Sequence, residues 1–393
     1  MEYKKIEMEN YMVVNKLYFS YYKKMNVTQI LVSILIVYCI IFPADKLNIK
    51  EVILLLTLAW GYLSDKKCFK ISKYIFEYAI VFPGILVVYA ILRGVNIGSI
   101  LSYAYVWVYL LLLPIILKKQ INIMNPFLGA TYFVALVIDF IMLTDVVGLF
   151  SLSKNPVAIF FNSMNELQGI GKGSLATFGY SIFYKSCPLI LITYGYFISR
   201  KKYLFAAPLL LSMLACGTRA NFLMALFITA LIPTLCTEKI SNKVLIILLL
   251  VGAGLYLLPR IYDQIVTLNA LKYDRSDLIK TSDVKIIINN MKNSISNFIL
   301  GTGVGSSFMS SRGKLMTTFE MSYVDYFRQV GLCGFIIFAH FLIKPLRVLF
   351  EKERWLFICY VAYLAVAFTN PLLVTSTSFM LYLLVYRSYM LDI

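Results

Sequence analysis

The sequence predicts an all-α, polytopic integral membrane protein with about 12 transmembrane helices. Hydrophobic residues make up 60% of the chain and charged residues 15%, whereas soluble domains are nearer half apolar and a quarter charged. The apolar residues form blocks of about 15 to 25, the length that crosses a bilayer core of roughly 30 Å as a helix. The basic residues also divide unevenly between alternate loops, which is typical of multi-pass membrane proteins.

The expected spans account for most of the chain after a polar, lysine-rich arm at residues 1–26. This arm lacks the apolar core of a signal peptide, and we expect it in the cytoplasm or on the membrane surface. Nine spans follow in 27–259, with an outer loop at 151–185, then a large loop at 260–322, then three spans in 323–393. The spans are 27–43, 51–64, 74–92, 98–117, 127–150, 186–199, 203–216, 219–236, 243–259, 323–343, 354–370 and 371–390.

The net charge of +17 would suggest nucleic acid as the partner of a soluble protein, but here membrane topology explains it. With both termini in the cytoplasm, 21 Lys and Arg residues lie in cytoplasmic segments and 7 in the short outer segments. The large loop holds 8 more, and loops longer than about 60 residues largely escape the positive-inside rule. The large loop is therefore expected outside the cytoplasm, and no nucleic-acid partner is expected.

Metal and redox chemistry find no support in the sequence. The seven cysteines contain no CxxC pair, and five of them lie in or at apolar spans, where a small buried hydrophobe is the simplest interpretation. The outer loops lack histidine and their carboxylates are scattered. We therefore expect no metal and no cofactor.

Charges within the fifth span favour a functional or structural partner. Asp139 and Asp145 lie in an apolar segment, where a carboxylate is costly and usually faces a cavity or another polar group. Two interpretations stay open: a cavity wall or a partner for Arg328 or Arg219, and a plain interhelical hydrogen bond. The next loop, 151–185, carries Lys172 within a glycine run, and we interpret it as a mobile segment that contacts substrate.

The turn between the seventh and eighth spans places Arg219 at the start of a helix on the outer side. A cation is disfavoured at a helix N-terminus, so a compensating anion is expected there. That anion is a protein carboxylate or a ligand phosphate, which the planar guanidinium binds with two hydrogen bonds.

The large loop contains the remaining candidates. Apolar residues recur at helical spacing, which predicts an amphipathic helix packed on the membrane or on the bundle; they are Val284, Ile287, Met291, Ile295 and Phe298. Asp274 and Arg275 precede this helix, and a Gly301, Gly303, Gly305 alternation follows it. Arg312 and Glu320 come next. In the tenth span, Asp325 and Arg328 share a helix face because they are three residues apart.

Three of these stretches together resemble the O-antigen polymerase and O-antigen ligase superfamily of bacterial envelope proteins. The segment 211–220, ending in Gly217-Thr218-Arg219-Ala220, resembles the family's apolar helix with its Ser-Arg-Gly-like turn. Asp274-Arg275 followed by 300–305 resembles its arginine and GxGxG pair, and 320–334 resembles the segment that ends the large outer loop. The resemblance covers roughly 203–389. The ligases have a His-Asn pair where this chain has Glu320-Met321, which favours a polymerase of the Wzy type.

The resemblance implies an enzyme of the bacterial cytoplasmic membrane that joins glycan units carried on undecaprenyl pyrophosphate. Its partners would be the lipid-linked donor and acceptor, the bilayer, a chain-length regulator and a flippase. Glu320 is then the candidate base, and Arg219 and Arg275 the groups that neutralise the departing pyrophosphate. The substrate-binding candidates are Arg328, Arg312, Asp274, Asp325, Asp139 and Lys172. The alternatives are a transporter or flippase of lipid-linked oligosaccharide, for which no repeat symmetry is evident, and a ligase-like glycosyltransferase.

Overall fold

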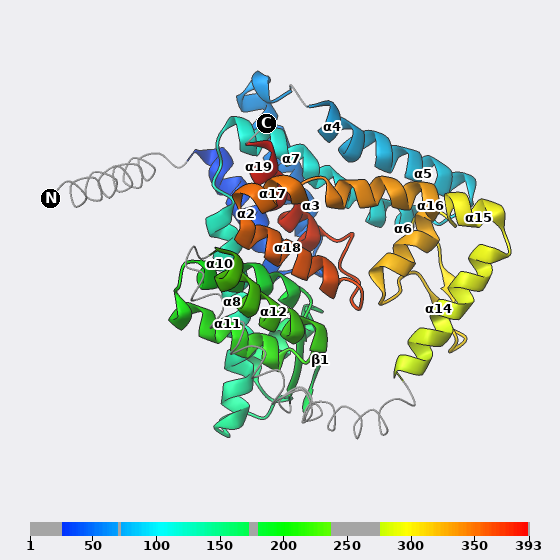
Figure 1. Ribbon diagram of the computed structural model, residues 1–393. Coiled ribbons are helices and arrows are strands. Elements are labelled where there is room, and N and C mark those ends of the chain that lie inside the picture. Colours follow the sequence, from blue (N-terminus) through cyan, green and yellow to red (C-terminus); the bar gives the residue numbers. More distant parts are fainter. Residues whose placement is uncertain (1–25, 70–71, 173–179, 237–275, 392–393) are drawn as a thin grey trace.

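The protein folds mainly into helices. The computed structural model describes residues 26–69, 72–172, 180–236 and 276–391, is 73% helical, and includes two short antiparallel strand pairs (Figure 1). The predicted helical class is therefore confirmed, while the strand pairs at residues 167–184 and 308–316 were not predicted.

The expected apolar spans coincide with helices wherever the structure describes them. In chain order these are α2 (Val27–Ile41), α3 (Ile49–Ser64), α4 (Lys73–Phe76) continuing through η2 (Glu77–Val81) into α5 (Phe82–Leu92), α6 (Ile97–Ala104) continuing through η3 (Tyr105–Leu111) into α7 (Leu112–Lys118), α8 (Met124–Val146), η5 (Cys187–Leu189) with α10 (Ile190–Ser199), α11 (Tyr203–Ala215), α12 (Arg219–Cys236), α16 (Ser322–Ile343), α18 (Arg354–Val366) and α19 (Ser376–Met390).

In the part of the chain that the structure describes, five helical segments are long and apolar enough to cross a membrane. They are Lys73–Leu92, Ile97–Lys118, Met124–Val146, Arg219–Cys236 and Ser322–Lys352, and four shorter apolar helices accompany them. This supports membrane-spanning character, while the number of twelve crossings stays a prediction. The arm and the predicted span 243–259 lie outside the described residues.

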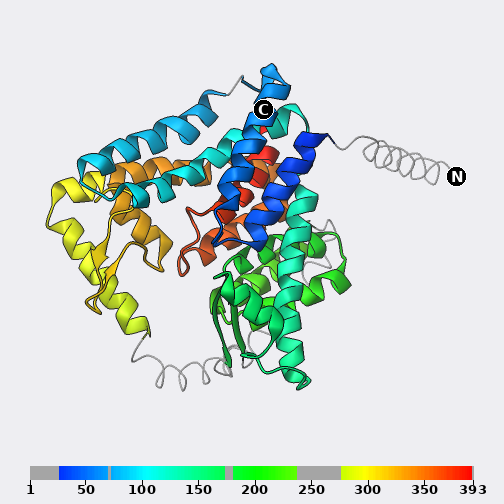
Figure 2. The same cartoon turned by 180° about the vertical axis from the view of Figure 1, so that it is seen from behind.

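The molecule has two ends, each marked by hydrogen bonds between segments distant in the sequence. At one end, the Lys119 ammonium donates to Thr28 and Ser64, and Tyr78 bonds His340. This end also holds the start of α2 and the C-terminal end of α19, and we call it the termini end (Figures 1 and 2). The opposite end, which we call the loop end, holds the strand pair β1 (Leu167–Lys172) and β2 (Tyr180–Tyr184) and the segment 301–322. Loops predicted on one side of the membrane thus meet one another.

The core is rich in aromatic side chains and centres on α19. Trp107 is 1% exposed and lies edge-on to Phe82 and Phe379, with ring centroids 5.2 Å away in each case. Residues 376–386 are all buried, because α2, η3, α7 and α17 (Leu346–Lys352) surround α19. This packing fixes the segment just before α19, residues 371–375, at the loop end.

The large loop has a small core of its own. The helix α14 (Ser276–Lys292) buries Ile287 and Met291 against Phe308 and Phe319, beside the head of α16. A second helix, α15 (Ile295–Leu300), begins after a break at Ser294, whose hydroxyl caps it. The predicted apolar stripe is therefore divided: its first part is packed, whereas Ile295 is 78% exposed. Figures 1 and 2 show α14 and α15 on the opposite side of the molecule from α8 and α11.

The outer loop 151–185 has more structure than the sequence suggested. It forms α9 (Pro156–Ser163) and then the pair β1–β2, in which Lys172 lies opposite Tyr180. Gly169 adopts φ +138° at a register shift between Leu167 and Ile170. The glycines as far as Lys172 thus belong to a bulged strand, which was not predicted from the sequence, while the mobility and the substrate contact of this segment stay predictions.

Candidate functional site at the loop end

The head of α16 is built around a buried ion pair. Arg328 Nη2 lies 2.8 Å from Asp325 Oδ1, and Nε donates to the same oxygen at 3.1 Å. Arg328 is 2% exposed and Asp325 5% exposed. The predicted shared face is thus confirmed, and Asp325, rather than Asp139, is the carboxylate that pairs with Arg328.

The remaining Arg328 donors hold the large loop. Nη1 donates to the carbonyl and the hydroxyl of Ser306, both at 3.0 Å, and Nη2 donates to the Thr317 carbonyl at 3.3 Å. The guanidinium also lies over the Phe308 ring, 5.0 Å from its centroid. Because its donors are satisfied within the protein, Arg328 organises the loop instead of facing an open binding surface.

A kink in α16 receives the glycine turn. Gly331 has φ 64° and ψ −171° inside the helix, which breaks the local helical hydrogen bonds. The freed carbonyls of Arg328 and Gln329 accept from the Thr302 and Gly303 amides, at 2.9 and 3.0 Å. The Gly305 amide donates to the Gln329 side chain at 2.8 Å. These amides are therefore engaged with α16, which shows what the turn does in the fold.

Two of the glycines in this turn are required by close backbone approach. A Cβ on Gly301 would lie 2.3 Å from the Gln329 carbonyl oxygen, and one on Gly305 would lie 2.7 Å from the backbone of Ser99. Both have positive φ, at +83° and +76°. The GxGxG pattern is thus explained by packing against α16 and α6.

A cavity of about 80 Å³ adjoins the ion pair. Its lining comes from α6, α16 and the segments 318–319 and 371–375, and comprises Tyr103, Thr318, Phe319, Ser322, Asp325, Tyr326, Pro371, Leu373, Val374 and Thr375. The Tyr326 hydroxyl is buried there without a hydrogen-bond partner in the described structure. Ligand pockets for small molecules measure roughly 300–1,000 Å³, so this space suits water or a single polar group.

A second buried polar cluster, which the sequence did not reveal, lies across the 371–376 segment. Lys50, 2% exposed, donates from Nζ to the Pro43 carbonyl at 2.8 Å and to Ser376 Oγ at 3.1 Å. Asp45 accepts from the Ile49 and Lys50 amides, at 3.0 and 2.8 Å, and so caps α3. The sequence feature that could have revealed this cluster is Lys50 itself, a cation in the first turn of an apolar helix. The same feature singled out Arg219.

Glu166 joins this cluster to the β1–β2 pair. Its Oε2 accepts from the Ala44 amide at 2.8 Å, while Oε1 is buried without a partner in the described part of the chain. Burial raises the pKa of the Glu166 carboxyl, whereas the Ala44 amide and the charges of Lys185 and Lys50 act in the opposite direction. Burial also lowers the pKa of Lys185. Glu166 thus links the segment at Ala44 to the β1–β2 pair through one carboxylate oxygen, while its other oxygen has no partner in the described structure.

Arg219 differs from these buried charges. It is the first residue of α12 and is exposed, following a tight turn in which Gly217 has φ +74° and packs against Ser181. Among the described residues no ion pair involves Arg219. The anion that the helix start favours is therefore not supplied by the described protein.

Glu320 and Arg312 are also at the surface of the loop end. Glu320 Oε2 lies 2.6 Å from Lys280 Nζ on α14, with the two side chains 56% and 31% exposed. Arg312 is exposed between β3 (Phe308–Met309) and β4 (Leu315–Met316). The structure thus brings an exposed acid and two exposed cations to one end of the helices.

The other predicted residues have different positions. Asp139 is 5% exposed in α8, with Oδ1 unpartnered in the described structure, and it pairs with neither arginine. Asp145 accepts from the Tyr180 hydroxyl at 2.8 Å, so it anchors β2. Asp274 and Arg275 lie outside the described residues, as does the side chain of Lys172. No group of three or more metal-ligating side chains occurs among the residues that the structure describes.

No protein-family model matches this chain, and no curated protein sequence matches it.

Proposed function

We propose that this protein is a bacterial cell-surface polysaccharide polymerase. It would act on the outer face of the cytoplasmic membrane, transferring a glycan from undecaprenyl pyrophosphate to the non-reducing end of another lipid-linked unit. The observation that supports this most is that Arg219, Glu320 and Arg312 are all exposed at the loop end, where the buried Arg328–Asp325 pair organises the large loop.

The reaction divides into two tasks. The acceptor hydroxyl oxygen forms a bond to the donor's anomeric carbon, and the bond from that carbon to the pyrophosphate oxygen breaks. The hydroxyl proton passes to a base, and undecaprenyl pyrophosphate leaves with the bonding electron pair. Because the donor is already activated, no nucleotide is consumed. Catalysis then requires neutralisation of the leaving group and orientation of the hydroxyl.

We assign residues of the loop end to these two tasks because their side chains are exposed and can contact a substrate. Arg219 meets the pyrophosphate, since its guanidinium lies at a helix start and suits a bidentate phosphate contact. Glu320 is the base, with Lys280 holding its carboxylate in position. Asp325 and Arg328 act as positioning residues, because they fix the loop that carries Glu320. Arg275 keeps its proposed role, which is the same as that of Arg219. Arg312 and Lys172 remain proposed substrate contacts.

A transporter of lipid-linked oligosaccharide is the second candidate. Asp139 favours it, because a buried carboxylate in an apolar helix with one oxygen unpartnered in the described structure is typical of translocation pathways. The two proposals differ in product, since a transporter forms no glycosidic bond.

The test is incubation of the purified protein in liposomes with one lipid-linked repeat unit. A polymerase gives a ladder of products, and Arg219→Ala should abolish it while Arg219→Lys retains part of it. Lys154→Ala is the matched control, since it removes an exposed cation from the same end and should leave the ladder intact. Movement of unit across the membrane with no ladder would favour the transporter.

Glu320→Gln tests the base in the same assay and should abolish the ladder without loss of protein. Lys280→Gln leaves the carboxylate in place and removes its partner, so a reduced ladder is expected. An unchanged ladder in Glu320→Gln would move the role of the base elsewhere.

A further inference from the structure

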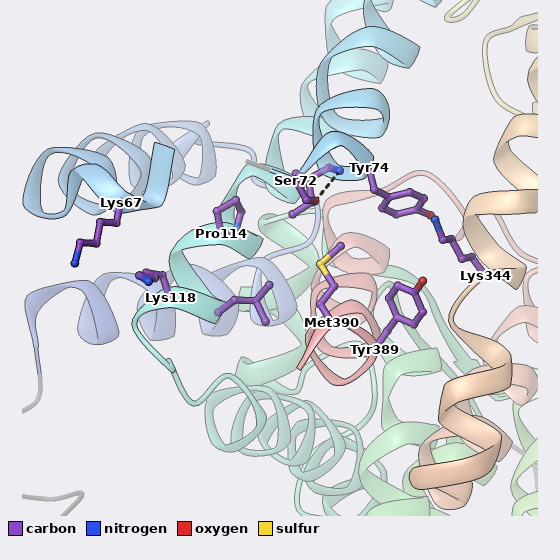
Figure 3. Close-up of a pocket in the computed structure, with 10 residues that line it drawn as sticks. Lys67, Ser72, Tyr74, Pro114, Lys118, Lys344, Tyr389 and Met390 are labelled. Atoms are coloured by element: carbon purple, nitrogen blue, oxygen red, sulfur yellow. Dashed lines mark hydrogen bonds between the residues drawn. The ribbon is translucent and has the colours of Figure 1, made fainter. Parts of the chain in front are cut away.

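A cavity of about 790 Å³ opens at the termini end, far along the helices from the site described above (Figure 3). It lies between η1 (Lys66–Phe69), the start of α4, the end of α7 and the ends of α16 and α19. Its lining residues are Lys67, Ser72, Tyr74, Ile75, Pro114, Leu117, Lys118, Lys344, Tyr389 and Met390. The volume is within the range of small-molecule sites, about 300–1,000 Å³.

The lining combines an apolar floor with cations at the rim. Figure 3 shows Pro114 and Met390 between two basic groups: Lys67 and Lys118 on one side, Lys344 on the other. Lys344 Nζ lies 3.6 Å from the centroid of the Tyr74 ring, so a cation–π contact holds it at the rim. None of the described lining residues carries a carboxylate.

Two acids lie near this rim, and one of them, Glu77, acts on the charge of Lys344, where it opposes the lowering of the Lys344 pKa by burial. Glu77 pairs with Lys73 at 3.8 Å, outside the lining, and the Asp65 carboxylate accepts the backbone amide of Lys67. Lys119, next to Lys118, is engaged by the hydroxyls of Thr28 and Ser64. The described part of the chain shows no such engagement for Lys67 or Lys118, both of which are exposed. Three cations thus share one concavity, which favours an anionic occupant.

The surroundings indicate that this occupant has apolar chains. Phe76 and Ile80, on the helix that begins at the cavity rim, are 47% and 43% exposed and offer an apolar face. The chain's own first 25 residues are not complementary to the rim, since they carry five Lys and three Glu.

We propose that this cavity binds the headgroup of an anionic phospholipid from the adjacent leaflet. The phosphate lies among Lys67, Lys118 and Lys344, and the acyl chains follow the apolar face at Phe76. Lysines at a membrane surface bind anionic lipid electrostatically, and a pre-formed concavity adds selectivity for one molecule. The inference is independent of the proposed polymerase activity.

The test is a lipid titration of the purified full chain in detergent, with bound lipid counted by native mass spectrometry. The wild type should retain one phosphatidylglycerol in preference to phosphatidylcholine. The triple variant Lys67→Gln, Lys118→Gln, Lys344→Gln should weaken that retention roughly tenfold or more, since each lysine contributes separately. Equal retention of both lipids by the wild type would overturn the proposal.

The matched control is Arg200→Gln, Lys201→Gln, Lys202→Gln. It removes the same charge at exposed residues that are not part of this cavity's lining, and should retain lipid like the wild type. An equal loss in both triple variants would show diffuse attraction and overturn the proposal. Displacement of lipid by millimolar inorganic phosphate would show a site for small anions and would overturn it too. Should the triple variant fail to fold, loss of lipid in Lys118→Gln with recovery in Lys118→Arg carries the test.

Discussion

Arg219 is the first residue of α12, and Arg328 lies near the start of α16. Both are at the loop end, but their environments are opposite. Arg328 is 2% exposed and donates to a carboxylate, two carbonyls and a hydroxyl of the protein. Arg219 is exposed, and no described residue forms an ion pair with it. A buried charge with a complete set of partners is committed to the fold, whereas an exposed one can still bind a ligand. Exposure therefore separates the structural from the functional candidates.

The largest expected effect is that of Arg328→Ala. It leaves the Asp325 carboxylate buried without its partner, and should lower the free energy of unfolding by about 3–5 kcal/mol. The measurement is thermal unfolding in detergent. Adding Asp325→Ala to it should restore part of the loss, because the two residues are coupled. A variant with unchanged stability and no product ladder would instead place Arg328 at the substrate.

Gly301→Ala tests the turn that Arg328 supports. The added Cβ would lie 2.3 Å from the Gln329 carbonyl oxygen at φ +83°, so the turn must leave the α16 kink. Gly313→Ala is the control: its φ is +68°, but nothing lies within 4 Å of the new atom. The control therefore measures the cost of the positive φ alone, roughly 1–3 kcal/mol. Gly301→Ala should lower the free energy of unfolding by more than that. Equal loss of stability would contradict the close approach.

The buried Glu166 should make stability depend on pH. Burial raises the pKa of its carboxyl in the folded protein, so its favourable contribution is present below the unfolded pKa of about 4.3. That contribution is lost as pH rises through the higher folded pKa. Glu166→Gln keeps an oxygen for the Ala44 amide and cannot ionise. Its unfolding midpoint should match the wild type in acid and exceed it near neutral pH; parallel profiles would contradict this.

Glu320→Gln should have a small effect on stability despite its 2.6 Å pair with Lys280. Both side chains are partly exposed, and such pairs contribute about 0–1 kcal/mol. The unfolding midpoint should therefore change little even if the product ladder disappears. A loss comparable to that of Arg328→Ala would show that the pair holds α14 on α16, and would weaken the case for a base.

Arg219→Ala should have the smallest effect on stability, within about 0.5 kcal/mol, because the side chain is exposed. Scanning fluorimetry of the variant beside the wild type measures it. A clear destabilisation would mean that Arg219 has a structural partner, and would remove the contrast with Arg328.

Local patterns in the sequence predicted the helical architecture and the shared helix face of Asp325 and Arg328, although not that the two residues pair. Both depend on residues close in the chain: apolar blocks of a helical length, and an acid and a base three positions apart. The amphipathic helix ahead of the glycine turn was predicted for the same reason. Its break at Ser294 was missed, although a serine that caps a new helix is a recognised signal.

Contacts between distant segments could not be predicted in this way. Lys50 meets Ser376 across 326 positions, and no periodicity links the two. The strand pair β1–β2 was missed because its glycine run lacks the alternation of a strand, Gly169 occupying a bulge. The role of the glycines at 301 and 305 likewise depends on backbone from α16 and α6, which only the folded chain brings close.

The break at Gly331 divides α16 into two pieces, which stay in contact through the rings of Tyr326 and Phe338, with centroids 4.3 Å apart. Its head is fastened sideways, through Thr302 and Gly303, to a segment that also receives the Tyr89 hydroxyl at the Gly301 carbonyl, 2.9 Å away. The piece after Gly331 packs in the aromatic interior around Trp107. The bend at Gly331 thus links the large loop to the aromatic interior, because one helix contributes to both.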